Sequence, residues 1–283
     1  MSAPRVVVLG GGRMGAGIAH AFLLAGSEVS VIERDDEQAA SARDRVLDSV
    51  RTSIRRGATT ESEAELARRL AVGATDEPLA LSDLVVEAVP EDFELKVATL
   101  TRIEAGVRGA ALIASNTSSM SIDDLAHALS DPGRFVGMHF FNPVPASTLV
   151  ELVRGSTTRD GVVAEAQRLV ALIGKTAVTV SDSPGFASSR LGVALGLEAI
   201  RMLEDGVASA ADIDLAMTLG YKHPVGPLRL TDIVGLDVRL GIAEYLHQRL
   251  GERFEPPALL REKVAAGELG RKSGRGFFEW PSE

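Results

Sequence analysis

Residues 5–33 read RVVVLGGGRMGAGIAHAFLLAGSEVSVIE, and this stretch decides the fold of the first part of the chain. Its initial apolar run predicts a buried strand, the glycines predict a tight turn, and the segment from Arg13 predicts a helix. A second apolar strand follows and ends in the acid Glu33. Strand, glycine-rich turn, helix, strand and acid in this order are the fingerprint of a dinucleotide-binding βαβ unit.

Each glycine of the turn has a distinct expected role. Gly10 permits the tight turn, Gly12 lets backbone amides approach a pyrophosphate, and Gly15 allows the helix to pack closely on the strand. The start of the helix, at Arg13 and Met14, offers unpaired N–H groups and a positive dipole to phosphates. We therefore expect these five residues to bind a dinucleotide.

Glu33 indicates which dinucleotide is bound. Its carboxylate would accept hydrogen bonds from the ribose hydroxyls and would repel a 2′-phosphate, which favours NAD over NADP. The neighbouring Arg34 could instead stack on adenine or meet such a phosphate. A plain βαβ unit with an unused crevice is the structural alternative.

The composition excludes several classes of protein. A net charge of -9 argues against a nucleic-acid surface dominated by phosphate contacts. The absence of cysteine excludes disulfides, thiolate catalysis and cysteine-ligated metal. The first strand begins at Arg5, which leaves no room for a signal peptide, and the apolar run 191–203 is too short and too charged to span a bilayer. We expect a soluble, cytoplasmic protein with no nucleic-acid or membrane partner.

The order of the predicted elements indicates two domains. Strands and helices alternate through the first part of the chain, which predicts an N-terminal Rossmann-type, doubly wound, mostly parallel sheet. The strands expected after the second cover 70–73, 84–89, 111–114, 134–138, 149–153 and 176–180. Beyond Pro184 the pattern is helical, with helices expected at 189–204, 210–218, 232–250 and 257–266 and one strand at 276–280. We therefore expect a nucleotide-binding domain at 1–183 and an all-helical domain at 184–283.

Polar residues follow two of the predicted strands. The loop 116–119 follows one strand, and the segment 139–143 follows the next. Ligands of open α/β sheets bind at this edge, and an alcohol dehydrogenase needs a base for the hydroxyl proton. His139 is the histidine placed there, although a buried structural histidine is the alternative. The remaining histidines are expected to be packed, on the surface or in a turn: His20, His127, His223 and His247.

Glu151 is the second candidate, since it interrupts the apolar strand LVELV at 149–153. A buried carboxylate is costly unless it is paired. Pairing with His139 would fix the imidazole tautomer and stabilise the imidazolium once it forms. Arg154 and Arg190 are the alternative partners.

Five segments together resemble the short-chain L-3-hydroxyacyl-CoA dehydrogenases, a family that includes bacterial 3-hydroxybutyryl-CoA dehydrogenases. They are ASNTSS (114–119), HFFNPVP (139–145), LVE (149–151), DSPGF (182–186) and GPLRLTDIVGLD (226–237). The resemblance extends from the first strand to GRGFF at 274–278.

The resemblance implies NAD-dependent oxidation of an L-3-hydroxyacyl-CoA to the 3-ketoacyl-CoA, without a metal. It makes His139 the general base, Glu151 its orienting partner and Ser118 the serine that hydrogen-bonds the reacting oxygen. The residues implied to hold the cofactor also include Glu33, Glu91, Lys96, Asn116 and Ser118. Those implied to contact the acyl-CoA substrate are Ser49, Arg56, Ser118, Asn142 and Ser189. The family also implies a homodimer formed through the helical domain and an active site between the domains.

Two positions depart from the family pattern. Ser189 stands where the family has an asparagine that helps to bind substrate, and Thr148 stands where a lysine is usual. A serine is shorter, so either a water bridges the gap or the substrate differs there. The alternatives are the same chemistry on a hydroxy acid that is bound to acyl carrier protein or is no thioester, and a catalytically weak NAD-binding relative. A lysine-dependent β-hydroxyacid dehydrogenase is disfavoured, since no lysine occurs between Pro184 and Lys222.

Overall fold

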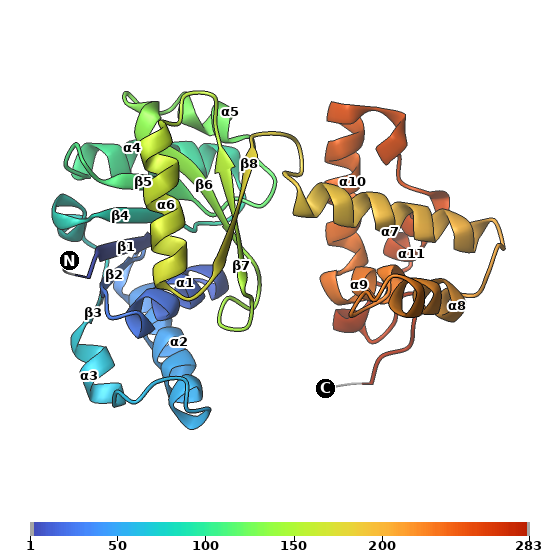
Figure 1. Ribbon diagram of the computed structural model, residues 1–283, viewed down its shortest axis with the longest axis horizontal. Helices are drawn as coiled ribbons and strands as arrows, with labels where there is room; N and C mark the ends of the chain where they lie inside the picture. The colour runs from blue at the N-terminus through green and yellow to red at the C-terminus, as the bar shows by residue number, and fades with distance from the viewer. Residues whose placement is uncertain (1–2, 282–283) are drawn as a thin grey trace. The chain divides into compact units, whose positions relative to one another are not determined.

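The computed structural model describes residues 3–281 and contains two compact units (Figure 1). The first unit ends at Asp182 and the second begins at Ser183. An eight-stranded sheet organises the first unit, and the described part of the second is built from helices.

The sheet has the strand order β3-β2-β1-β4-β5-β6-β7-β8. The strands are β1 (Arg5–Leu9), β2 (Glu28–Ile32), β3 (Leu70–Gly73), β4 (Leu84–Glu87), β5 (Leu112–Ser115), β6 (Phe135–Phe140), β7 (Leu149–Arg154) and β8 (Thr176–Ser181). The first six strands are parallel to one another, whereas β7 pairs antiparallel with β6 and parallel with β8. The predicted doubly wound, mostly parallel sheet is confirmed.

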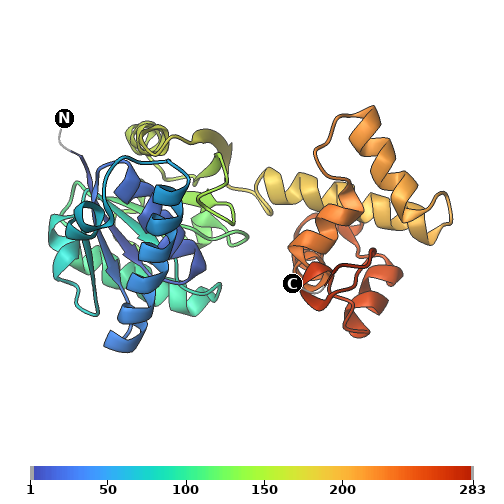
Figure 2. The same ribbon diagram turned by 90° about the horizontal axis from the view of Figure 1, so that it is seen from below.

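Helices cover both faces of the sheet. They are α1 (Arg13–Leu24), α2 (Asp36–Arg55), α3 (Glu63–Arg68), α4 (Phe93–Gly106), α5 (Ile122–Ala126) and α6 (Asp160–Leu172). Helices α1, α2 and α6 share one apolar core with the strands, and α1 lies beside α2 (Figure 2). Helices α4 and α5 pack against each other and against β4 and β6. Burial on both faces explains why the central strands read as continuous apolar runs.

Strand β6 differs from its predicted range in a way that matters for the site. Arg134 ends a short 3₁₀ turn, so the strand begins at Phe135 and continues to Phe140. His139 therefore lies inside the strand, opposite Glu151 of β7. The connection at 141–148 is too short for a parallel crossover, so the two strands form an antiparallel pair.

The second unit consists of α7 (Ser188–Glu204), α8 (Ala210–Leu215), α9 (Pro227–Val234), α10 (Leu236–Leu250) and α11 (Ala258–Ala265). Short turns of other helix types occur at Ala216–Gly220, Glu252–Phe254 and Arg271–Ser273. The first unit has two similar turns, at Glu77–Leu81 and Pro132–Arg134. None of the helices within residues 3–281 combines the length and hydropathy needed to cross a bilayer.

Two predictions for the second unit are wrong. The helix expected at 232–250 is two helices, because Gly235 between them has a φ of 105°. The strand expected at 276–280 forms only isolated bridges, because two of its amides have a side-chain acceptor instead of a neighbouring strand. The buried carboxylate of Asp232 accepts hydrogen bonds from the backbone N–H groups of Phe277 and Phe278 and from the indole of Trp280, at 2.8, 2.9 and 2.8 Å.

Candidate active site

A pocket of about 850 Å³ opens at the carboxyl ends of the parallel strands of the first unit. Its wall receives residues from the ends of β1, β2, β4, β5 and β6. The sequence-predicted site residues on that wall are Gly10, Gly12, Arg13, Met14, Glu33, Glu91, Asn116, Ser118, His139 and Asn142. Segments far apart in the sequence thus meet where a doubly wound sheet binds its ligand.

The glycine turn has the shape that a dinucleotide needs. Gly10 has a φ of 93°, and a Cβ there would lie 2.8 Å from the carbonyl oxygen of Ala88. A Cβ on Gly15 would lie 1.8 Å from the carbonyl oxygen of Gly10. At Gly12, by contrast, a Cβ would meet no atom within 4 Å. Gly10 and Gly15 are therefore required by the fold, whereas Gly12 leaves open space beside the start of α1 for a phosphate group.

We predict that Gly12→Ala weakens NADH binding at least tenfold while the melting temperature stays near the wild-type value. The added methyl group would occupy the space through which the pyrophosphate approaches the backbone, without touching the protein. Gly15→Ala is the matched variant, since its methyl group would collide with Gly10 and lower the melting temperature as well. Fluorescence titration with NADH and thermal denaturation measure the two effects. Unaltered NADH affinity in Gly12→Ala would contradict this role.

Glu33 is fixed at the rim of the glycine turn. One carboxylate oxygen accepts a hydrogen bond of 2.7 Å from the backbone N–H of Gly11, and the other accepts one of 3.3 Å from that of Arg34. The Arg34 guanidinium pairs with Asp35 at 3.0 Å. A carboxylate thus lies beside the glycine turn on the pocket wall, and the arginine next to it already has an acidic partner. This arrangement suits an unphosphorylated ribose.

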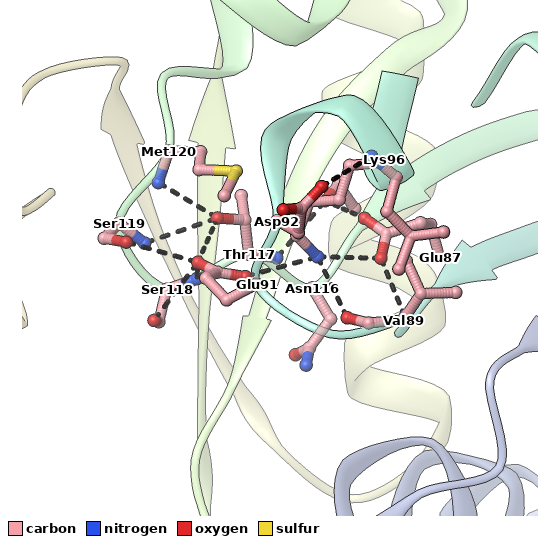
Figure 3. A network of polar contacts seen from close by, with 12 residues as sticks. Glu87, Val89, Glu91, Asp92, Lys96, Asn116, Thr117, Ser118, Ser119 and Met120 are labelled. Carbon is pink, nitrogen blue, oxygen red and sulfur yellow. Dashed lines mark hydrogen bonds and ion pairs between the residues drawn. The ribbon is translucent and has the colours of Figure 1, made fainter. Parts of the chain in front are cut away.

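Glu91 organises the loop that follows β5 (Figure 3). Its Oε1 accepts hydrogen bonds from the Thr117 hydroxyl at 2.6 Å, the Ser118 N–H at 2.9 Å and the Ser119 hydroxyl at 3.2 Å. Its Oε2 lies 3.2 Å from Nζ of the buried Lys96. Burial raises the pKa of Glu91, but the charge of Lys96 and the hydrogen bonds outweigh it and hold this pKa below its ordinary value.

Asn116 connects two strand ends. Its side-chain oxygen accepts a hydrogen bond of 2.9 Å from the backbone N–H of Phe140, at the end of β6. The amide group therefore fixes the end of β5 against the strand that carries His139. Both Asn116 and His139 line the pocket.

His139 and Glu151 form a buried pair across β6 and β7. Nδ1 of His139 lies 3.1 Å from Oε2 of Glu151, and the two residues are 7% and 1% exposed. The alternative partners are engaged elsewhere, since Arg154 pairs with Asp160 and Arg190 donates a hydrogen bond to Ser183. With the carboxylate at Nδ1, the opposite ring nitrogen, Nε2, is the one suited to exchange a proton with a ligand.

His20 is packed, as expected. It is buried on α1, where Nε2 lies 2.9 Å from the hydroxyl of Ser53. Burial, helped by the positive charge of Lys175, lowers the pKa of His20 to about 4. His20 is therefore neutral near pH 7.

Other predicted site residues lie away from the pocket wall of the first unit. Arg56 directly follows the end of α2, and Ser49 lies about two turns earlier in that helix. The Ser49 hydroxyl donates to the carbonyl of Arg45 at 3.1 Å. Lys96 is buried beside Glu91, and Gly15 is buried within α1. Ser189 belongs to the second unit, in the first turn of α7.

Sequence reasoning missed several residues of this region. The pocket is also lined by Leu95, Thr99 and Arg102 of α4, whose periodicity gives no sign of a ligand. Glu87, at the end of β4, is fully buried and bonded to Lys96. The signal for it was an acid within the apolar run LVVEAV at 84–89.

A doubly wound sheet, a dinucleotide turn and a histidine–carboxylate pair at one pocket define an NAD-binding oxidoreductase. Two family models match the chain: "3-hydroxyacyl-CoA dehydrogenase, NAD binding domain" over residues 5–183, and "3-hydroxyacyl-CoA dehydrogenase, C-terminal domain" over residues 185–280. The chain belongs to the 3-hydroxyacyl-CoA dehydrogenase family, as the sequence motifs indicated.

Relatives resemble the chain over its full length. It is 41% identical over 280 residues to a 3-hydroxybutyryl-CoA dehydrogenase of Mycobacterium tuberculosis, and this match covers 98% of each chain. It is 38% identical over 282 residues to a probable 3-hydroxybutyryl-CoA dehydrogenase of Bacillus subtilis, which covers 99% of this chain and 98% of the relative. The crystal structure of an (S)-3-hydroxybutyryl-CoA dehydrogenase from Ralstonia eutropha matches with a TM-score of 0.94 and 40% identity, over 99% of this chain and 100% of that one.

Proposed function

We propose that this enzyme oxidises an L-3-hydroxyacyl-CoA with a short acyl group, such as 3-hydroxybutyryl-CoA, to the 3-ketoacyl-CoA. The observation that carries the proposal is the His139–Glu151 pair, since His139 lines the same pocket as the glycine turn and Glu33. The short acyl group is supported by the relatives that are named 3-hydroxybutyryl-CoA dehydrogenases, which are 41% and 40% identical to this chain.

The proposed mechanism uses three side chains of the first unit. When bound, NAD supplies the acceptor for the hydride that leaves C3 of the substrate. His139 takes the proton of the 3-hydroxyl group at Nε2, and Glu151 holds Nδ1 and stabilises the imidazolium. Ser118 hydrogen-bonds the reacting oxygen through its hydroxyl group. Glu91 supports this step, because its bond to the Ser118 N–H holds the loop in place.

The proposed cofactor contacts divide along the pocket. Gly10, Gly12, Arg13 and Met14 hold the pyrophosphate, with Gly15 packing beneath them. Glu33 holds the adenosine ribose. Glu91, Asn116 and Ser118 hold the nicotinamide side, and Lys96 acts from behind Glu91.

The proposed contact with the nucleotide end of CoA lies at the end of α2. Arg51 pairs with Asp48 and Glu63, and Arg55 donates to Thr52. Arg56 is exposed and has no side-chain partner among residues 3–281, so it can meet a phosphate. Ser49 lies two turns before it on the same helix. Asn142 and Ser189 are assigned to the acyl end.

We predict that Ser189→Asn raises kcat/KM for acetoacetyl-CoA by about two- to tenfold, the range of one hydrogen bond gained at the substrate. The reason is that an asparagine reaches further than the serine of this chain. Initial rates with NADH measure the effect, and Ser188→Asn on the same helical turn is the control. An unchanged kcat/KM would indicate that a water or another side chain already makes this contact.

The carrier of the acyl group decides between this proposal and its main alternative. The assay compares the (S)- and (R)-3-hydroxybutyryl thioesters of CoA, the thioester of acyl carrier protein and the free hydroxy acid, each with NAD. The proposal requires the (S)-CoA thioester to have the highest kcat/KM. A preference for the carrier-protein thioester or the free acid would favour the alternative and would give Ser189 and Thr148 a role in selecting it.

We also propose that the second unit, from about residue 184, is the dimerisation domain. Most of the exposed large apolar side chains of the described chain belong to this unit, which leaves apolar surface for a second copy to cover. They are Leu191, Val207, Leu215, Leu219, Tyr221, Leu230, Ile233, Val234 and Val238.

A further inference from the structure

Glu87, Lys96 and Glu91 form a network of hydrogen bonds and ion pairs beside the pocket. Glu87 is the last residue of β4 and is fully buried. Its Oε1 accepts hydrogen bonds from Nζ of Lys96 at 2.7 Å and from the backbone N–H of Val89 at 2.8 Å. Its Oε2 accepts one of 2.5 Å from the hydroxyl of Ser115 on β5. A carboxylate removed from water needs such partners, and Glu87 has three of them.

Lys96 is shared by two acids. Its ammonium group lies 2.7 Å from Oε1 of Glu87 and 3.2 Å from Oε2 of Glu91, and the side chain is 1% exposed. Figure 3 shows the lysine between the two carboxylates. Two acids and one ammonium group leave the network with one surplus negative charge.

The surplus charge lies on the pocket side. Glu91 lines the pocket, whereas Glu87 and Lys96 are sealed behind it. Hydrogen bonds from the Thr117 hydroxyl and the Ser118 N–H hold the Glu91 carboxylate beside the loop assigned to the reacting oxygen. Because one ammonium group cannot balance two carboxylates, the network presents a net negative charge to this part of the pocket through Glu91.

We propose that Glu87 is a positioning residue that sets the net charge of the Glu87–Lys96–Glu91 network. This charge strengthens the binding of NAD⁺ relative to that of NADH. The nicotinamide ring is positively charged in NAD⁺ and neutral in NADH. A fixed negative charge in a partly water-excluded pocket therefore stabilises the oxidised form selectively. This inference rests on the proposed function, which assigns the nicotinamide to the end of the pocket near Ser118 and His139.

A purely structural role for Glu87 makes a different prediction. If the network only kept β4, β5 and α4 in register, its loss would weaken the binding of both cofactor forms by the same factor. If it sets the charge, the two affinities change by different factors. The ratio of the dissociation constants, Kd(NAD⁺)/Kd(NADH), therefore distinguishes the two roles.

The test is Glu87→Gln, which keeps the side-chain size and brings the network to zero net charge. We expect Kd(NAD⁺)/Kd(NADH) to rise by roughly three- to tenfold, the effect of one unit charge acting over several ångströms in a partly solvated pocket. Calorimetry gives the NAD⁺ constant and fluorescence titration the NADH constant. Glu104→Gln is the matched control, since Glu104 pairs with Arg134 away from the pocket and its loss should leave the ratio unchanged.

A second variant restores the charge. Glu87→Gln combined with Lys96→Met leaves the single charge of Glu91, so the ratio should return to within about twofold of the wild-type value. Replacing a buried ion pair by neutral groups is commonly tolerated, so this variant carries the test if the single variant does not fold. Adding Glu91→Gln then removes the last charge and should raise the ratio again.

An equal change of both dissociation constants in every variant would overturn the proposed role of Glu87. The same result with normal wild-type turnover would leave the proposed function intact. Wild-type protein that binds neither NAD⁺ nor NADH would instead contradict the proposed function itself.

Discussion

Replacing His139 by glutamine is expected to lower kcat about a thousandfold, within the range that a positioned general base contributes. Glutamine is similar in size and can hydrogen-bond, but it cannot accept the hydroxyl proton at neutral pH. Steady-state oxidation of 3-hydroxybutyryl-CoA measures kcat, and fluorescence titration measures NADH affinity, which should stay near the wild-type value.

A loss of activity in His139→Gln must be distinguished from a loss of stability, because the side chain is buried. His139 is 7% exposed within a central strand, so thermal denaturation should accompany the assay. His20→Gln is the matched control, because His20 is also buried in the first unit but lies away from the pocket wall. A folded His139→Gln protein with wild-type kcat would remove His139 from the mechanism.

Replacing Glu151 by glutamine is expected to lower kcat about a hundredfold or more, since the imidazolium formed during oxidation would lose its charged partner. Because the proton acceptor would lose the carboxylate that holds Nδ1, the dependence of kcat on pH should change as well. The profile of kcat against pH measures both effects.

The control for Glu151 is Glu165→Gln, which removes an exposed ion pair with Arg168 on α6. That change should leave kcat and the pH–rate profile unaltered. If the Glu151 variant kept the wild-type profile, the 3.1 Å contact between Glu151 and His139 would have no part in proton transfer.

The nucleotide-binding half of the fold was predictable because its signals are local. The glycine turn and the acid at Glu33 each lie within a few residues of the strand or helix that they define. The pairing of His139 with Glu151 was also accessible, because a carboxylate in an apolar strand requires a partner.

Features that depend on residues far apart in the sequence were harder to predict from the sequence. The terminal segment 276–280 has the alternation of a strand, but the amides of Phe277 and Phe278 are bonded to Asp232, more than 40 positions earlier. The role of Glu87 depends on Lys96 of α4 and Ser115 of β5, which only the folded sheet brings together. Gly235 could have been recognised as a break between helices, since glycine commonly ends a helix in a positive-φ conformation.

The most direct test of the proposed function is the consumption of NADH with acetoacetyl-CoA, measured beside NADPH under the same conditions. The arrangement of Glu33, Ser118, His139 and Glu151 predicts rapid turnover with NADH and a kcat/KM at least tenfold lower with NADPH, since a 2′-phosphate would meet the carboxylate of Glu33. Tight NADH binding without turnover of acetoacetyl-CoA or longer 3-ketoacyl-CoA thioesters would contradict the proposed substrate class.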